Sequence, residues 1–176
     1  MKPTALLIPA ALFACGTLSA QAGPSAAALA DWQRDKTNVL AYVDAMPESA
    51  LTFRPTPGVR TFAEQIDHVV ATNVDVAAQA LRGLARSPQL GDSTQFLHSK
   101  AALHAYVAAT YDYVLAAMHE AAPAMWTRNS PMYGQPPQVP ARWLELSHEH
   151  SIWTLGQVVP YLRLNHVTPP SYQIPL

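Results

Sequence analysis

Apolar residues recur at helical spacing in four long stretches of the chain. In the first, residues 26–46, apolar positions three or four residues apart alternate with charged ones. Similar patterns run over residues 61–84, from 92 or 93 to about 121, and over 140–165. No stretch shows the alternation of β-branched and polar residues that is typical of strands. The pattern therefore predicts an all-α fold with four helices.

Proline and glycine mark the connections between these helices. Pro47 ends the first stretch, and residues 53–58 (FRPTPG) cannot continue a helix because proline lacks the N–H and clashes with the preceding turn. The third connection, residues 123–140, is rich in proline and has no internal periodicity. Such a segment is either a functional lid or strap, or disordered. Four helices with long first and third connections predict a four-helix bundle.

The last helical stretch, residues 140–165, is apolar nearly all round and is expected to be the central helix. His150 lies within it. At about 100° per residue, its neighbours on the helix surface include two tryptophans and two leucines, so its imidazole should be buried or at the base of a pocket. The residues predicted to line this pocket are Trp143, Trp153, Gln157 and Tyr161.

A second histidine lies on the second helix. Thr61 and Glu64 fit a capping box, in which the hydroxyl and the carboxylate bond orphan N–H groups at a helix start. His68 then falls on a polar stripe opposite the apolar side of that helix. The simpler interpretation of this stripe is a solvated face, and the alternative is a buried site.

The histidines of the last helix do not form a chelating pair. Two histidines share a metal when they lie four residues apart on one face, but the fourth residue after His150 is Thr154. His148 is two residues before His150 and so lies about 160° away around the helix. The His-Glu-x-x-His, nucleophile-elbow, phosphate-loop and dinucleotide motifs do not occur.

Composition and charge narrow the class of protein. The chain has 176 residues, 49% hydrophobic and 13% charged, which indicates one domain with a sizeable core. Its formal charge is -1 and it has no cluster of lysine and arginine, so we expect no nucleic-acid partner. The single cysteine excludes disulfide frameworks and multi-thiolate zinc sites.

The first 22 residues have the pattern of a bacterial signal peptide. Lys2 is followed by an apolar run over residues 5–14 and by the small-x-small triplet at 20–22. We expect cleavage before Gly23, a single mature domain over residues 23–176, and a periplasmic or secreted location. The apolar run is too short for a transmembrane segment. An alternative is a lipid anchor on Cys15, because residues 12–15 resemble a lipoprotein cleavage box.

Several short motifs occur in order along the chain. The second helix carries T-F-A-E-Q-x-x-H at residues 61–68, after F-R-P at 53–55. The last helix carries H-x5-G-Q-x3-Y-L-R at residues 150–163, before Pro169 and Pro170. Together these motifs resemble the DinB-like (YfiT-type) superfamily of four-helix bundles. The resemblance covers nearly all of the predicted mature chain.

This resemblance implies a metal site. Members typically bind a divalent metal, often nickel or zinc, through one histidine of the second helix and two histidines, four residues apart, of the fourth. For this chain, the resemblance implies His68 and His150 as ligands and places Thr154 in the position of the third histidine. A threonine hydroxyl is a poor substitute for imidazole, so the site departs from the family pattern.

Three functions are compatible with these observations. The first is an exported DinB-like protein with a partly degenerate metal site that binds a small molecule in the bundle pocket. The second, by analogy with the family, is a metal-dependent hydrolase or thiol transferase. The third is a non-catalytic structural or interaction module that forms homodimers through its helices.

Overall fold

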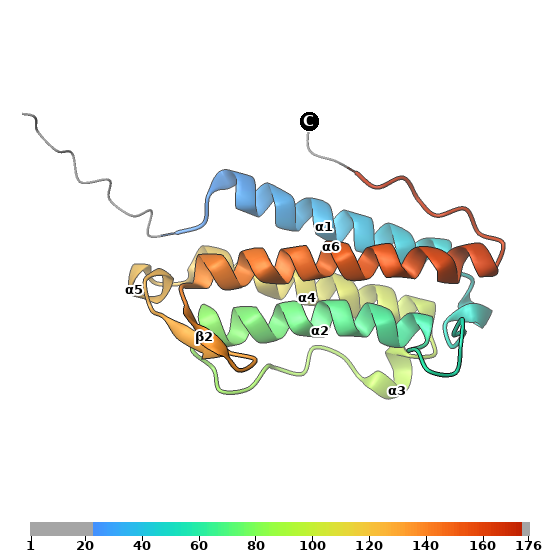
Figure 1. Cartoon of the computed structure of the whole chain (residues 1–176), viewed down its shortest axis with the longest axis horizontal. Coiled ribbons are helices and arrows are strands. Elements are labelled where there is room, and N and C mark those ends of the chain that lie inside the picture. The colour runs from blue at the N-terminus through green and yellow to red at the C-terminus, as the bar shows by residue number, and fades with distance from the viewer. Residues whose placement is uncertain (1–22, 174–176) are drawn as a thin grey trace, which may run out of the picture.

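Four long helices form a bundle in the part of the chain that the computed structural model describes, residues 23–173 (Figure 1). They are α1 (Ala26–Ala45), α2 (Phe62–Ala80), α4 (Lys100–Glu120) and α6 (Pro140–Leu164). The predicted all-α class is confirmed. The predicted signal peptide and the lipidation position Cys15 lie outside the described residues.

The helices pack around one apolar core. α2 packs against α4 and α6, and α1 packs against the same two helices. The largest wholly buried side chains come from α1, α2, α4, α6 and the first connection, and burying each one stabilises the fold by about 1.5–3 kcal/mol. They include Trp32, Met46, Leu51, Phe62, Ile66, Leu103, Tyr111, Met118, Leu155 and Leu162.

The second connection is longer than the sequence pattern indicated. α2 and α4 run in the same direction, so residues 81–92 return along the length of the bundle before α4 starts (Figure 1). The single helix predicted from 92 or 93 to 121 is wrong, because it is divided into α3 (Ser93–Phe96) and α4. Asp92 caps the first and Ser99 caps the second, and each side chain accepts a hydrogen bond from a backbone N–H of its own helix.

The first and third connections are ordered. A short 3₁₀ helix, η1 (Glu48–Ala50), follows α1. The third connection contains α5 (Pro123–Trp126) and an antiparallel hairpin of β1 (Ser130–Met132) and β2 (Gln135–Gln138). The prediction that the chain contains no strands is therefore wrong for this segment. The alternative prediction that the segment is disordered is wrong as well.

The core also contains a polar network. Asn73 Oδ1 accepts hydrogen bonds from Ser147 (2.6 Å) and Ser151 (3.0 Å), and the Tyr111 hydroxyl donates to Asp35 (2.8 Å). These bonds link α2 to α6 and α1 to α4.

Across residues 23–173, no helix combines the length and apolar character that crossing a bilayer requires.

Candidate functional site

The start of α2 fixes the position of His68. The predicted capping box is present: Glu64 N–H donates to the Thr61 hydroxyl (3.2 Å), and Thr61 N–H donates to the Glu64 carboxylate (2.7 Å). These bonds satisfy two orphan N–H groups and set where the helix begins. His68 follows within two turns, on the side of α2 that packs against α6.

His68 and His150 face each other across the α2–α6 interface. Their ring centroids are 5.0 Å apart, and the rings are nearly perpendicular. Thr154 lies one turn further along α6, with its hydroxyl oxygen 3.4 Å from His150 Nε2. The three positions implied by the family resemblance therefore lie together. His68 is half-buried, so the interpretation of its stripe as a solvated face does not hold at this position.

Burial and a nearby arginine keep both imidazoles neutral at neutral pH. Burial lowers the pKa of His68 below its ordinary value, the charge of Arg60 lowers it further, as does a proton on His150 when that ring is charged, and Asp67 acts in the opposite direction. Burial, followed by the charge of Arg60, lowers the pKa of His150. Each neutral ring has one nitrogen with a free lone pair, which can accept a hydrogen bond or coordinate a metal.

The donor set does not fit a three-histidine metal centre. No group of three histidine, cysteine, aspartate or glutamate side chains is placed to hold a metal within residues 23–173. Thr154 supplies only a neutral hydroxyl. In addition, His150 Nδ1 is buried without a hydrogen-bond partner, whereas a metal-ligating histidine usually donates its second nitrogen to a neighbouring acceptor.

A cavity of about 300 Å³ adjoins the two imidazoles, and we call it the histidine cavity. Its walls are mainly apolar, and its polar groups are the two rings and three hydroxyl-bearing residues. It is lined by His68, Thr72, Val76, Tyr133, Trp143, Leu146, Ser147 and His150. Of the predicted pocket residues, only Trp143 lines it.

The hairpin forms one wall of the histidine cavity. The Tyr133 hydroxyl donates to Asp75 on α2 (2.7 Å), and its ring meets that of Trp143 edge to face at 6.4 Å. Trp143 Nε1 in turn donates to the Ser130 carbonyl (2.8 Å). The sequence did not identify Tyr133, although a functional lid or strap was one of the two alternatives for residues 123–140. The available signal was Gly134, because glycine favours the positive φ of a tight hairpin turn, and in the structure Tyr133 and Gly134 both have positive φ.

The other predicted pocket residues lie elsewhere. Gln157 and Tyr161 line a separate cavity near the loop before α2, where Gln157 accepts from Gln65 (3.3 Å) and Tyr161 donates to the Arg60 carbonyl (2.8 Å). The placement of Trp153 in the pocket is wrong, because its side chain is 70% exposed. It lies about 60° around α6 from His150, which is enough to bring it to the solvent side.

Comparisons with known proteins agree with this architecture. A DinB-like protein of Bacillus subtilis matches with a TM-score of 0.67 and 13% identity, over 84% of this chain and 98% of that one. A DinB-like protein of Bacillus cereus matches with a TM-score of 0.65 and 17% identity, over 83% and 95%. No curated protein gives a significant match. A family model described as the DinB superfamily matches residues 31–158, and the chain belongs to this superfamily.

Proposed function

We propose that this protein binds a small, largely apolar molecule in the histidine cavity. The observation that carries the proposal is the cavity itself, which has apolar walls and two neutral imidazoles at one end. Ligand sites commonly combine such walls with a few convergent polar groups. Its size suits a molecule of one or two rings.

The polar end restricts the head group of the ligand. Two neutral imidazoles can each donate one hydrogen bond and accept another, so a hydroxyl, carbonyl or ring N–H is suitable. The charge of Arg60 already lowers the pKa of both histidines, so it also disfavours a cationic head group there. We therefore expect a neutral or anionic ligand.

A divalent metal, nickel or zinc, is the second part of the proposal. His68 and His150 would hold it, and a bound ion would supply Lewis-acid chemistry. These residues provide two of the three protein ligands of a usual catalytic zinc site, so we expect weak binding by the unmodified chain. The incomplete donor set favours ligand binding over the hydrolase or thiol-transferase function.

Export to the periplasm remains part of the proposal on the strength of the pattern in residues 1–22. Mass spectrometry of the protein from fractionated bacterial cells should give a periplasmic chain that begins at Gly23. A lipid on Cys15 would instead establish the anchored alternative, and an uncleaved cytoplasmic chain would contradict both. The proposed homodimer would be contradicted by a monomeric mass in light scattering at micromolar concentration.

Binding of indole tests the main proposal, because indole has an apolar body and an N–H that a neutral imidazole can accept. In ligand-observed NMR, the purified chain without a histidine tag should show saturation transfer to indole. Leu146→Trp should abolish this transfer, because its added ring fills the histidine cavity. His150→Ala should weaken binding by about tenfold through loss of one hydrogen bond.

The matched control is Leu164→Trp, which adds the same side chain at an exposed position of the same helix. This variant should bind indole as the unmodified chain does. Absence of transfer to indole, phenol and benzamide alike would contradict the proposal. So would equal binding by the Leu146→Trp and Leu164→Trp variants.

A further inference from the structure

The histidine cavity occupies one end of a longer seam between α2 and α6, which run in opposite directions (Figure 1). Along this seam Gln65 donates to Gln157 (3.3 Å), and one turn further along α2 His68 faces His150. The α2 residues that line the seam are three or four positions apart and so share one side of the helix: Gln65, His68, Thr72 and Val76. They span about 16 Å, which is room for a ring and a short arm.

A cavity of about 650 Å³ lies at the other end of this seam, and we call it the arginine cavity. Arg60 is the one charged side chain among the described residues that line it, and Gln65, Gln157 and Tyr161 form its side on the two helices. A surface groove shares Arg60 with this cavity and His68 with the histidine cavity. The three hollows therefore adjoin one another along the seam.

The guanidinium of Arg60 forms no ion pair within residues 23–173. The two acids of the adjoining groove have other partners. Glu64 accepts from the N–H of the helix cap and lies 3.7 Å from Arg54. Asp67 accepts from the Tyr106 hydroxyl (2.8 Å). The positive charge of Arg60 is thus left available to a ligand.

The position of Arg60 directs this charge to the polar end of the histidine cavity. Its backbone carbonyl accepts from the Tyr161 hydroxyl (2.8 Å), which fixes the point from which the side chain starts. After burial, the charge of Arg60 is the next cause that lowers the pKa of both His68 and His150. An anionic group held near these imidazoles therefore lies within reach of the same charge.

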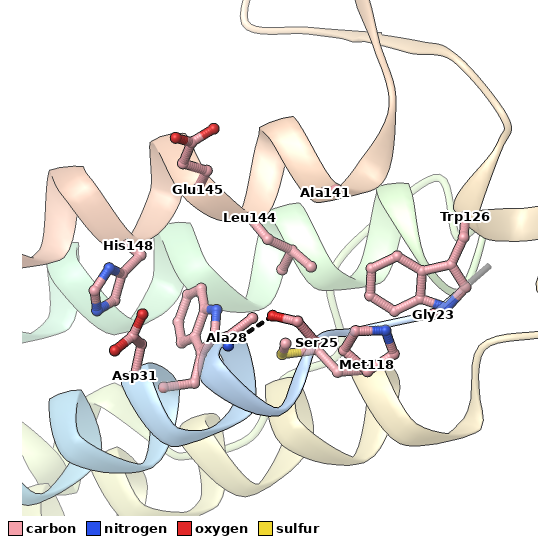
Figure 2. Close-up of a pocket in the computed structure, with 12 residues that line it drawn as sticks. Gly23, Ser25, Ala28, Asp31, Met118, Trp126, Ala141, Leu144, Glu145 and His148 are labelled. Atoms are coloured by element: carbon pink, nitrogen blue, oxygen red, sulfur yellow. Dashed lines mark hydrogen bonds between the residues drawn. The ribbon is translucent and has the colours of Figure 1, made fainter. Parts of the chain in front are cut away.

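The cavity between α1, α4 and α6, of about 340 Å³, has no comparable free charge (Figure 2). Its carboxylates are those of Asp31 and Glu145, and each is paired with an arginine at 2.7 Å. Its apolar wall includes Trp32 and Trp126, so an aromatic ring can enter it. Selection for an anion is therefore expected at Arg60 and not there.

We propose that the ligand of the histidine cavity is an amphiphilic carboxylate, with its apolar ring in that cavity and its carboxylate paired with Arg60. This inference rests on the proposed function and adds the charge of the ligand and the residue that selects for it. A guanidinium presents parallel N–H donors that match a carboxylate. Gln157, whose side-chain oxygen accepts from Gln65, has its NH₂ group left to donate a further hydrogen bond.

Indole-3-propionate tests this inference, and indole-3-propanol is its uncharged analogue of nearly the same shape. At low ionic strength, isothermal titration calorimetry should show the acid binding about fivefold more tightly than the alcohol, as expected for a solvent-exposed ion pair. Arg60→Gln should lose this preference while its affinity for the alcohol stays the same. Arg60→Lys, which keeps the charge, should retain a preference for the acid. High salt should reduce the preference.

Three further variants define the site. Arg86→Gln removes the same charge at an exposed position outside the seam and should leave the preference unchanged. Ala141→Trp adds a ring at the cavity of Figure 2 and should leave both affinities unchanged. Leu146→Trp fills the histidine cavity and should abolish binding of both compounds. Circular dichroism confirms that each variant is folded.

The outcomes separate this inference from the proposed function. Equal affinity for the acid and the alcohol, or a preference that persists in Arg60→Gln, overturns the inference and leaves the proposed function in place. Absence of binding by both compounds also overturns the inference, and the indole measurement then decides on the proposed function by itself. Loss of binding in Ala141→Trp would contradict both, because the ligand would lie in the other cavity.

Discussion

The Thr154 hydroxyl lies 3.4 Å from Nε2 of His150, at the position from which a third imidazole would approach a metal. Thr154 is buried, so its side chain is held in place by its surroundings. Imidazole is a much better ligand for zinc or nickel than a neutral hydroxyl is. The side chain at position 154 is therefore the difference between the two histidines of this site and the three histidines that the family resemblance implies.

Thr154→His should therefore raise metal affinity. Its imidazole would lie one turn from His150 on the same face of α6 and beside His68. We expect Zn²⁺ to bind at least tenfold more tightly than to the unmodified chain, as measured by isothermal titration calorimetry on untagged protein.

Thr154→Val is the matched control, because it keeps the branched shape and removes the hydroxyl without adding a ligand. Its Zn²⁺ affinity should not exceed that of the unmodified chain. The Thr154→His/His68→Ala double variant should lose the gain, since two ligands again remain. If Thr154→His gave no gain although it folded normally, the arrangement of the three positions as a latent metal site would be refuted.

Among the elements, the β1–β2 hairpin forms one wall of the histidine cavity through Tyr133. It is attached to the bundle by the bond from Tyr133 to Asp75 (2.7 Å) and by that from Trp143 to the Ser130 carbonyl (2.8 Å). Tyr133 adopts φ 52°, a left-handed conformation that is unfavourable for a residue with a side chain. The contacts of Tyr133 with Asp75 and Trp143 offset this cost and hold the hairpin against the wall of the cavity.

Tyr133→Phe should loosen the hairpin, because it removes the bond to Asp75 and leaves the ring in place. We expect faster hydrogen–deuterium exchange of amides in residues 130–138, by about five- to tenfold for a bond of about 1 kcal/mol. Exchange in α1 should not change. Tyr113→Phe is the control, because the Tyr113 hydroxyl is buried without a hydrogen-bond partner. Equal exchange in the two variants would show that the bond does not hold the hairpin.

Comparison at the element scale shows what the sequence could predict. The four long helices and the Thr61–Glu64 cap follow from local periodicity and capping chemistry, and the structure confirms them. The hairpin could not be predicted from alternation, because β2 consists of two prolines flanked by glutamines. Its strands are stabilised by contacts with distant residues of α2 and α6, which no local pattern reveals.

The candidate site could be predicted only in part, because local patterns do not show which side chains the distant elements cover. The spacing on α6 and the resemblance to the family place His68, His150 and Thr154 together, and in the structure the two rings do face each other. Trp153 was misplaced because α6 is apolar nearly all round, so periodicity alone could not identify its solvent side. The packing of α2 and the hairpin decides which aromatic side chain of α6 is covered.

For the whole molecule, the core contains an acid whose charge opposes folding. Asp35 is fully buried; its Oδ2 accepts from Tyr111 (2.8 Å), and its Oδ1 has no partner. Burial raises the pKa of Asp35, and this effect outweighs the hydrogen bond from Tyr111, the nearby Ser151 hydroxyl and the nearby charges of His148 and Arg34, which lower it. The folded protein therefore holds this proton to higher pH than the unfolded chain does.

This preference makes stability depend on pH in a definite direction. In the unfolded chain, an aspartate loses its proton near pH 3.9. In the folded protein the proton is held to higher pH, so Asp35 contributes full stability below the unfolded pKa and loses it as pH rises through the folded pKa. Asp35→Asn, which has no proton to lose, should be free of this loss. Chemical denaturation from below the unfolded pKa, at about pH 3.5, up to mildly alkaline pH measures the difference.

The free energy of unfolding of the unmodified chain, minus that of Asp35→Asn, should thus fall as pH rises and then level off. A tenfold difference in the acidity of Asp35 between the folded and the unfolded chain corresponds to about 1.4 kcal/mol of this fall. Asp112→Asn is the control, because it removes an exposed carboxylate that pairs with Lys36 at the surface. A difference that stayed constant with pH would show that Asp35 carries its charge in the core as easily as in water. The hydrogen bonds of the polar network would then offset the whole cost of burying that charge.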